Sequence, residues 1–261
     1  MTPQERLLRY KPPPECLAGQ VVLITGASRG IGAAVSRAVA AAGAEIIILG
    51  RNVTLMEKLA TEITATGLPE PGIVPINLEA AKVDDYERVA NLVKERYGHL
   101  NGLILNAGML GQMAPIETYD PLSWARVFQL NVHSQFLLLQ VMLPLLDRSE
   151  KGSIIFTSSG VGRKARAYWG AYAASKFATE GMMQVLADEL ADRNRIRVNS
   201  LNPGRLRTQM RAEAYPAEDP ASLRRPKEIT NGYLFLLGPD SADVHGITLD
   251  AQSKGATLIQ E

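Results

Sequence analysis

Short apolar runs alternate with segments of helical periodicity along most of this chain. The runs are apolar almost throughout, and strands that are apolar on both faces are typical of parallel sheets covered by helices on both sides. Right-handed connections between such strands give a doubly wound, Rossmann-like α/β fold. The predicted strands cover 21–25, 46–49, 73–76, 103–105, 153–157, 196–201 and 247–249, and the predicted helices cover 30–43, 55–65, 83–97, 124–146, 172–190 and 229–237, with Pro144 expected to end the fourth helix.

Two segments depart from this alternation. Residues 1–20 contain the run Pro12-Pro13-Pro14, which is excluded from a helix interior, so they are predicted to form an arm that leads into the fold. Residues 205–225 are rich in proline and mixed charge and predict a mobile loop with one or two short helices. Ligands of doubly wound sheets bind beyond the carboxyl ends of the strands, so this loop is a candidate substrate lid. We expect a single domain over 21–261.

Composition excludes several classes of protein. The chain has 28 Lys and Arg against 27 Asp and Glu, and this balance argues against a nucleic-acid partner. The single cysteine excludes an internal disulfide and a multi-cysteine metal cluster, and the three histidines lack metal-ligand spacing, so no metal is expected. No apolar run approaches the ~20 residues of a membrane span. The first residues lack the apolar stretch of a signal peptide, so we expect a cytoplasmic protein with no membrane partner.

A glycine-rich turn directly follows the first predicted strand. It comprises Thr25, Gly26, Ala27, Ser28, Arg29, Gly30, Ile31 and Gly32. Gly26 permits a tight turn, Gly30 allows the backbone to approach a pyrophosphate, and Gly32 allows the next helix to pack close to the sheet. The N-terminus of that helix offers free N–H groups and partial positive charge to phosphates. A simple strand–helix turn would need fewer glycines, so the pattern predicts a dinucleotide site.

The end of the second predicted strand indicates which dinucleotide is bound. NAD-binding proteins usually carry a carboxylate there, which holds the ribose 2′-hydroxyl. This chain has Gly50, Arg51 and Asn52 instead. Arg51 is suited to pair with a 2′-phosphate, and Arg29 is placed to form the other side of that pocket. The alternative is that Arg51 is a solvated loop charge. We therefore favour NADP(H) over NAD(H).

A tyrosine and a lysine lie four residues apart at the start of a predicted helix. This spacing stacks Tyr172 and Lys176 on one helical face. A free phenol has a pKa of ~10, and a neighbouring ammonium is expected to lower it toward working pH. Ser159, thirteen residues before Tyr172, ends a predicted strand and is a second candidate hydroxyl, with Ser158 as its alternative. Taken alone, this spacing is also typical of a tyrosine and a lysine that are exposed on a helix surface and have no catalytic role.

These motifs together resemble the short-chain dehydrogenase/reductase family from residue 21 to about residue 250. Six motifs occur in the family's order, and the stretch 156–189 is similar to a bacterial branch, the YciK type. The motifs are the glycine turn at 25–32, Asn106-Ala107-Gly108, the helix asparagine Asn131, Ser159, the pair Tyr172 and Lys176, and the segment 203–208.

The resemblance implies a role for each of these residues. Ser159 and Tyr172 would hold a substrate carbonyl oxygen, and Tyr172 would give it a proton while the nicotinamide delivers hydride. Lys176 would bind the nicotinamide ribose and lower the pKa of Tyr172, and Asn131 would position a water in a proton relay. The implied cofactor contacts are Gly26, Ser28, Arg29, Gly30, Ile31, Gly32, Arg51, Asn77, Leu78, Asn106, Ala107, Gly108, Tyr172, Lys176, Pro203, Gly204, Leu206 and Thr208.

Two functional readings follow. The favoured one is an NADP(H)-dependent oxidoreductase that acts on a small carbonyl or alcohol substrate, with Tyr172 as general acid and base. The alternative is an NADP(H)-binding sensor with little turnover, which would have no need of the phenol. The predicted helices 124–146 and 172–190 are apolar on most sides. Members of the family usually pair such helices across a two-fold axis, so a homodimer or homotetramer is expected.

Overall fold

The computed structural model describes residues 1–193 and 195–253. Seven strands form one sheet in the order β3-β2-β1-β4-β5-β6-β7, and all neighbouring strands are parallel. The doubly wound fold predicted from the apolar runs is confirmed. The strands are β1 (Val21–Thr25), β2 (Glu45–Gly50), β3 (Gly72–Pro75), β4 (Gly102–Leu105), β5 (Gly152–Thr157), β6 (Ile196–Asn202) and β7 (Thr248–Asp250).

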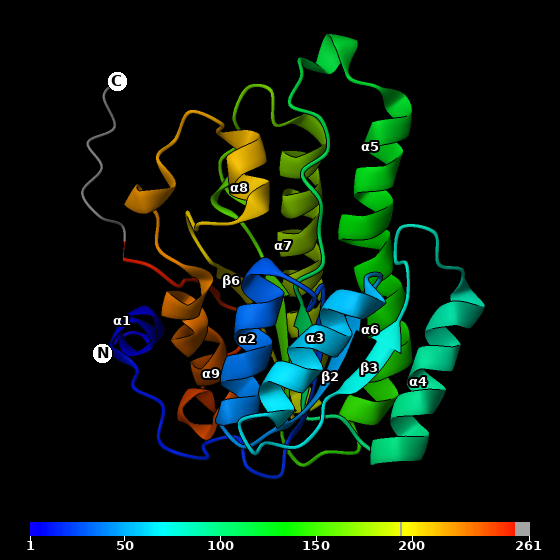
Figure 1. Cartoon of the computed structure of the whole chain (residues 1–261), viewed down its shortest axis with the longest axis vertical. Coiled ribbons are helices and arrows are strands. Elements are labelled where there is room, and N and C mark those ends of the chain that lie inside the picture. Colours follow the sequence, from blue (N-terminus) through cyan, green and yellow to red (C-terminus); the bar gives the residue numbers. More distant parts are fainter. Residues whose placement is uncertain (194, 254–261) are drawn as a thin grey trace.

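Helices cover both faces of the sheet (Figure 1). On one face α2 lies between α3 and α9, and on the other face α4, α6 and α7 pack against the strands. The helices are α1 (Pro3–Arg9), α2 (Gly30–Ala41), α3 (Val53–Thr64), α4 (Val83–Tyr97), α5 (Pro121–Phe128), α6 (Ser134–Leu146), α7 (Gly170–Leu190), α8 (Gln209–Ala214) and α9 (Thr230–Leu237).

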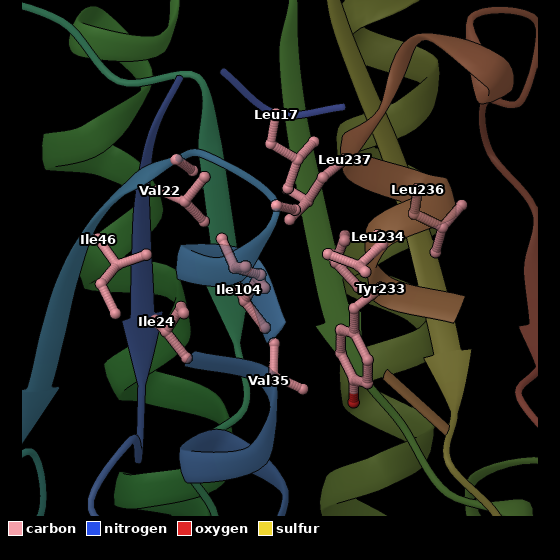
Figure 2. Packing of buried hydrophobic residues seen from close by; sticks show 14 of the residues in the cluster. Leu17, Val22, Ile24, Val35, Ile46, Ile104, Tyr233, Leu234, Leu236 and Leu237 are labelled. Carbon is pink, nitrogen blue, oxygen red and sulfur yellow. The ribbon is translucent and has the colours of Figure 1, made fainter. Parts of the chain in front are cut away.

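Strand β1 shows why the strands are apolar throughout. Its five residues are all buried, and successive side chains point to opposite faces of the sheet. Val22 and Ile24 join the core on the α2 and α9 side, where Figure 2 shows them near Val35 and Ile104. Val21 and Leu23 join the core on the other side. Strand β1 therefore contributes to both cores, and this requirement excludes the alternation of apolar and polar residues that a half-exposed strand shows.

The predicted helix 124–146 is two α-helices joined by a turn of π-helix. Helix α5 ends at Phe128, the π-helical turn covers Gln129–His133, and α6 follows directly. The expectation that Pro144 ends this helix is wrong, because α6 continues to Leu146. Proline removes the hydrogen bond that its own N–H would have donated and crowds the carbonyl four residues earlier, and Pro144 lies in the last turn of α6, where few further helical bonds depend on it. Wide turns of this kind often lie at functional sites, and this one carries Asn131.

The N-terminal arm contains a helix that the run of prolines obscured. Thr2 caps α1 by accepting a hydrogen bond from the Glu5 N–H at 3.2 Å, and Glu5 in turn accepts one from the Thr2 N–H at 2.9 Å. Leu7 is buried in the core beneath α9. The side chain of Gln4 both donates to the backbone carbonyl and accepts from the backbone N–H of Asp250, each at 2.8 Å. Helix α1 is therefore docked against the edge strand β7.

The segment 205–225 lies beyond the carboxyl ends of the strands, with α8 at the same end of the molecule as the start of α2 (Figure 1). It contains α8 and a short 3-10 helix at Pro220–Ser222, as expected. Arg211 ties the segment together, since its guanidinium pairs with both carboxylate oxygens of Glu218 at 2.5 and 2.7 Å. Within the described part of the chain, no helix has the length and apolar character needed to cross a bilayer.

Candidate active site

The glycine turn between β1 and α2 is folded as tightly as the sequence predicts. Gly26 and Gly30 have φ angles of +64° and +58°, in the left-handed region that favours glycine. A Cβ on Gly32 would overlap the carbonyl oxygen of Gly26, so this helix start approaches the turn more closely than any side chain permits. A Cβ on Gly26 would lie 2.9 Å from the Cα of Ala107. The turn is thus shaped by backbone packed against backbone.

The N-terminus of α2 fits an anionic group. Arg29 occupies the N-cap position, and its side chain makes no capping hydrogen bond. It reaches across to α8 instead and donates to the side-chain oxygen of Gln209. The first-turn N–H groups of α2, which have no intrahelical partners, are left without a side-chain cap. Ser28 and Ile31 lie in the same turn, and the methyl group of Thr208 is 3.9 Å from where a Cβ on Gly30 would stand.

Asn106 and Ala107 brace this turn from the end of β4. The backbone N–H groups of both residues donate to the Thr25 hydroxyl at 2.9 Å, and the Asn106 amide donates to the Thr25 carbonyl at 3.0 Å. Gly108 follows directly, and a Cβ there would lie 3.3 Å from the Oδ1 of Asn131. The segment 106–108 therefore links the glycine turn to the asparagine in the π-helical turn.

The predicted 2′-phosphate site lies at the end of β2. The side chain of Arg51 is 63% exposed, and its Nη1 lies 3.2 Å from the Oε2 of Glu79. Glu79 also pairs with Arg126 on α5 at 2.5 Å, and its N–H donates to the Oδ1 of Asn77 at 3.3 Å. Leu78 is buried between them. Arg51 thus has an ionic partner in the chain, yet most of its side chain faces solvent.

Tyr172 and Lys176 lie at the same end of the sheet, in the first turns of α7. Tyr172 is buried, and the Ser159 side chain lies near enough to its hydroxyl to act on the pKa of the phenol. The Nζ of Lys176 lies 5.7 Å from the centre of the Tyr172 ring and donates to the carbonyl oxygen of Thr157 at 2.7 Å. The three side chains predicted from the Ser, Tyr and Lys spacing are therefore brought together.

The pKa of Tyr172 differs from the expectation. Burial raises the pKa of the Tyr172 phenol above its usual value, and the Ser159 hydrogen bond only partly opposes this effect. The ammonium of Lys176 was expected to lower the pKa of Tyr172, but it is turned to the Thr157 carbonyl. Burial also lowers the pKa of Lys176 to about 8, against an opposing effect of Glu180. Both groups are thus shifted toward their neutral forms by loss of water.

Asn131 is fixed by three hydrogen bonds. Its Oδ1 accepts from the Met109 N–H at 2.9 Å, and its Nδ2 donates to the Met109 carbonyl and the Ser175 hydroxyl, both at 3.0 Å. The π-helical turn places this side chain at the inner surface of the helix, where it is fully buried. Ser175 precedes Lys176, so the contact joins Asn131 to α7.

Ser158 and Ser159, the two candidate hydroxyls, have different neighbours. Ser159 acts on the pKa of Tyr172, whereas the Ser158 hydroxyl donates to Glu180 on α7. Glu180 was missed from the sequence, although its place four residues after Lys176 put both on one helical face. Its partners come from strands far apart in the chain, and this arrangement gave no local signal.

An aromatic wall lies beside Tyr172. The Trp169 ring is 5.7 Å from the Tyr172 ring and 5.8 Å from the Tyr215 ring just beyond α8. The guanidinium of Arg211 stacks 3.7 Å from the Tyr215 ring centre. Below this wall, residues 203–208 run from β6 to α8. In that segment Leu206 is buried, Gly204 has a φ of +74°, Thr208 caps α8, and the Pro203 carbonyl accepts from Gln252 at 2.8 Å.

Comparison with known proteins agrees with this geometry. A family model described as short chain dehydrogenase matches residues 20–219. The chain therefore belongs to the short-chain dehydrogenase/reductase family, whose members are nicotinamide-dependent oxidoreductases. It is of the YciK type, since it is 45% identical to the oxidoreductase YciK of Escherichia coli over 245 residues, covering 94% of this chain and 96% of that protein.

Solved structures extend the likeness to three dimensions. A short chain dehydrogenase from Pseudomonas syringae is 48% identical, with a TM-score of 0.92 over 93% of this chain and 98% of that one. A short chain dehydrogenase from Escherichia coli CFT073, solved in complex with NADPH, is 46% identical, with a TM-score of 0.89 over 92% of this chain and 100% of that one.

Proposed function

We propose that this enzyme transfers hydride between NADP(H) and a small carbonyl or alcohol substrate, with Tyr172 as general acid and base. The observation that carries the proposal is the meeting of Tyr172, Ser159 and Lys176 at the end of the sheet where the glycine turn lies. A buried phenol beside a second hydroxyl is suited to hold and protonate one oxygen atom.

The residues present fit a dinucleotide. Gly26 and Gly32 leave no room for a Cβ, and the α2 N-terminus lacks a side-chain cap, so both features suit a pyrophosphate. When bound, the nicotinamide supplies or accepts the hydride. We propose that residues 106–108 border the adenosine, with Asn77 and Leu78 beside the adenine. Pro203, Gly204, Leu206 and Thr208 are proposed to line the carboxamide.

The protein residues would move the proton. In the reduction direction, Tyr172 gives its hydroxyl proton to the substrate oxygen, while Ser159 donates a second hydrogen bond to the same atom. The phenolate left on Tyr172 is costly in a buried site, because burial raises the pKa of this phenol. An ammonium on Lys176 offsets that cost and binds the nicotinamide ribose, and Asn131 holds a water through which Lys176 exchanges protons with solvent.

The residues at the end of β2 favour NADP(H) over NAD(H) as the cofactor. Arg51 is largely exposed there, and Arg51 and Asn52, not an acidic residue, directly follow the strand, so a 2′-phosphate would meet a cation. The Escherichia coli CFT073 relative solved with NADPH supports this choice. Binding would exchange the Arg51–Glu79 pair for a charge-assisted hydrogen bond to phosphate.

We also propose that the chain forms a homodimer or homotetramer through α6 and α7. Three large apolar side chains on these helices are exposed: Phe136 at 48%, Phe177 at 45% and Val185 at 59%. Covering them would bury apolar surface that one chain leaves in water. A sedimentation experiment at micromolar concentration tests this proposal, and a stable monomer would contradict it. The cytoplasmic location stays a prediction of the sequence.

The enzymatic proposal is tested by following NADPH oxidation with ketones, quinones and acyl-chain carbonyls. We expect turnover with at least one of these classes, and a faster rate with NADPH than with NADH. Calorimetric binding of NADPH with no turnover across the panel would favour the sensor reading instead. Absence of binding with either nucleotide would contradict both readings.

A further inference from the structure

Glu180 is a buried carboxylate one helical turn beyond Lys176 on α7. It is 6% exposed, and three hydroxyl groups donate to it. These are Ser158 just after β5, Ser200 on β6 at 2.7 Å and Thr248 on β7 at 2.8 Å. Each hydroxyl has a single proton to donate, and a carboxyl group that receives three such bonds has its lone pairs satisfied in the ionised form. The contacts therefore hold a negative charge beneath the active site.

The charged groups around Glu180 form a neutral set only when Lys176 is protonated. Arg163, just after the short helix at Gly160–Gly162, has its Nε 3.9 Å from a Glu180 oxygen. The same guanidinium donates to both oxygens of Asp250 on β7 at 3.0 Å. Two carboxylates and one guanidinium carry a net charge of −1, and the ammonium of Lys176 brings the set to zero. Glu180 and Lys176 are the buried members of this set, so each would be destabilised by loss of the other's charge.

We propose that Glu180 is a positioning residue for the proposed reaction, which it serves by keeping Lys176 protonated and by anchoring, through Ser158, the backbone that presents Ser159. The inference rests on the proposed function, because an ammonium on Lys176 is what stabilises the Tyr172 phenolate there. Glu180 is placed to act through Lys176 and Ser158, since its own hydrogen bonds go to hydroxyls of the sheet.

Electrostatics supports this role. Burial lowers the pKa of Lys176 to about 8, and Glu180 acts in the opposite direction. An opposite charge one helical turn away typically shifts a pKa by about one unit or more in a buried site. Without the carboxylate, the pKa of Lys176 would fall further, and a larger share of Lys176 would be the neutral amine at pH 7.

The test measures the titration of Lys176 directly, without a substrate. The full-length protein is labelled at the lysine Cε carbons, the NMR signal of Lys176 is assigned by its loss in Lys176→Arg, and the midpoint is followed with pH. In the unaltered protein we expect a midpoint above 7. In Glu180→Gln, which keeps the side-chain volume, we expect the midpoint to fall by about one unit or more. An unchanged midpoint in this variant would overturn the proposal.

A matched control separates charge from packing. Ser200→Ala removes one hydroxyl from Glu180 but leaves the carboxylate, so the Lys176 midpoint should move by no more than about a third of the Glu180→Gln shift. An equal shift in both variants would assign the effect to packing and reject the electrostatic role. Should Glu180→Gln fail to fold, the unaltered protein still decides, because a Lys176 midpoint below 7 contradicts the proposal.

Turnover then connects this coupling to the reaction. With a carbonyl substrate from the screen, loss of the Lys176 ammonium as pH rises should reduce kcat, and Glu180→Gln should move this descending limb to lower pH. A limb that stays in place while the NMR midpoint moves would reject the role in catalysis. The NMR result does not require turnover, so failure of the proposed function and failure of the Glu180–Lys176 coupling are distinguishable.

Discussion

The two halves of the active-site edge are built by different means. Around β1 and α2 the site is made of backbone packed on backbone, and glycine is required because a Cβ would overlap a neighbouring carbonyl. Around α7 the site is made of buried polar side chains whose partners come from β5, β6, β7 and the π-helical turn. The first kind of site can be predicted from the sequence, because it needs particular residue types at fixed spacing. The second depends on which distant strands the fold brings together.

The largest expected effect lies in the side-chain half. Tyr172→Phe removes the hydroxyl and leaves the ring that packs against Trp169, so the variant should bind NADPH as the unaltered protein does. We expect kcat to fall by at least ~10²-fold, as for removal of a general acid. NADPH oxidation and calorimetry on the same preparation measure both quantities. Retained turnover would reject Tyr172 as the proton donor.

In the glycine turn between β1 and α2, Gly32→Ala should weaken NADPH binding and also lower the stability of the protein. The added methyl group would overlap the Gly26 carbonyl oxygen, and overpacking of this kind costs about 1–3 kcal/mol of unfolding free energy. We expect NADPH affinity to fall by about tenfold or more, since 1.4 kcal/mol corresponds to a factor of ten. Denaturant unfolding and NADPH titration measure the two effects.

Gly181→Ala is the matched control for that substitution. Gly181 lies inside α7, and a Cβ there would meet no atom within 4 Å. Alanine is favoured over glycine in a helix interior by about 0.5–1 kcal/mol, so this variant should gain stability with unchanged NADPH affinity. Equal losses in Gly32→Ala and Gly181→Ala would show that close backbone approach is not what requires glycine at position 32.

A smaller effect is expected at the end of β2. Arg51→Gln removes the cation proposed to meet the 2′-phosphate, so NADPH affinity should fall by about tenfold while NADH affinity stays the same. Arg37→Gln is the control, because Arg37 is also exposed and ion-paired, to Glu62 between α2 and α3. The ratio of the two dissociation constants is the readout. A ratio unchanged in Arg51→Gln would leave Arg51 as a solvated loop charge.

The smallest effect concerns the arm docked on β7. Thr2→Ala removes the hydroxyl that caps α1, and loss of such a cap costs about 0.5–2 kcal/mol. Because α1 contacts the edge strand that also carries Thr248, hydrogen exchange at β7 should quicken before exchange at β1 does. Equal exchange rates in both strands would show that α1 does not stabilise this edge.

Most of the fold was predictable because each strand and each long helix carries its own periodicity. Helix α4 was predicted over the residues that it occupies, and the strands β1 and β5 agree to within one residue. The glycine turn and the Tyr172–Lys176 pair were also visible, since their residues lie close in sequence. The break at Gln129–His133 was not, because the apolar pattern continues through it.

What escaped prediction depends on long-range contacts or on competing signals. The capping pattern of Thr2 and Glu5, with Pro3 at the first helical position, indicated α1, but the run of prolines at 12–14 outweighed it. The partners of Glu180 lie on β6, on β7 and just after β5, and no local sequence pattern connects these segments. The raised pKa of Tyr172 needed its burial, which spacing along a helix does not reveal.

The most direct test of the central claim follows the hydride itself. NADPH deuterated at the transferable C4 position is incubated with the ketones and acyl-chain carbonyls of the panel, and the product alcohols are analysed by mass spectrometry. We predict deuterium on the former carbonyl carbon with the unaltered enzyme, and at least ~10²-fold less labelled product with Tyr172→Phe. Unlabelled product, or equal labelling by the two proteins, would contradict the account.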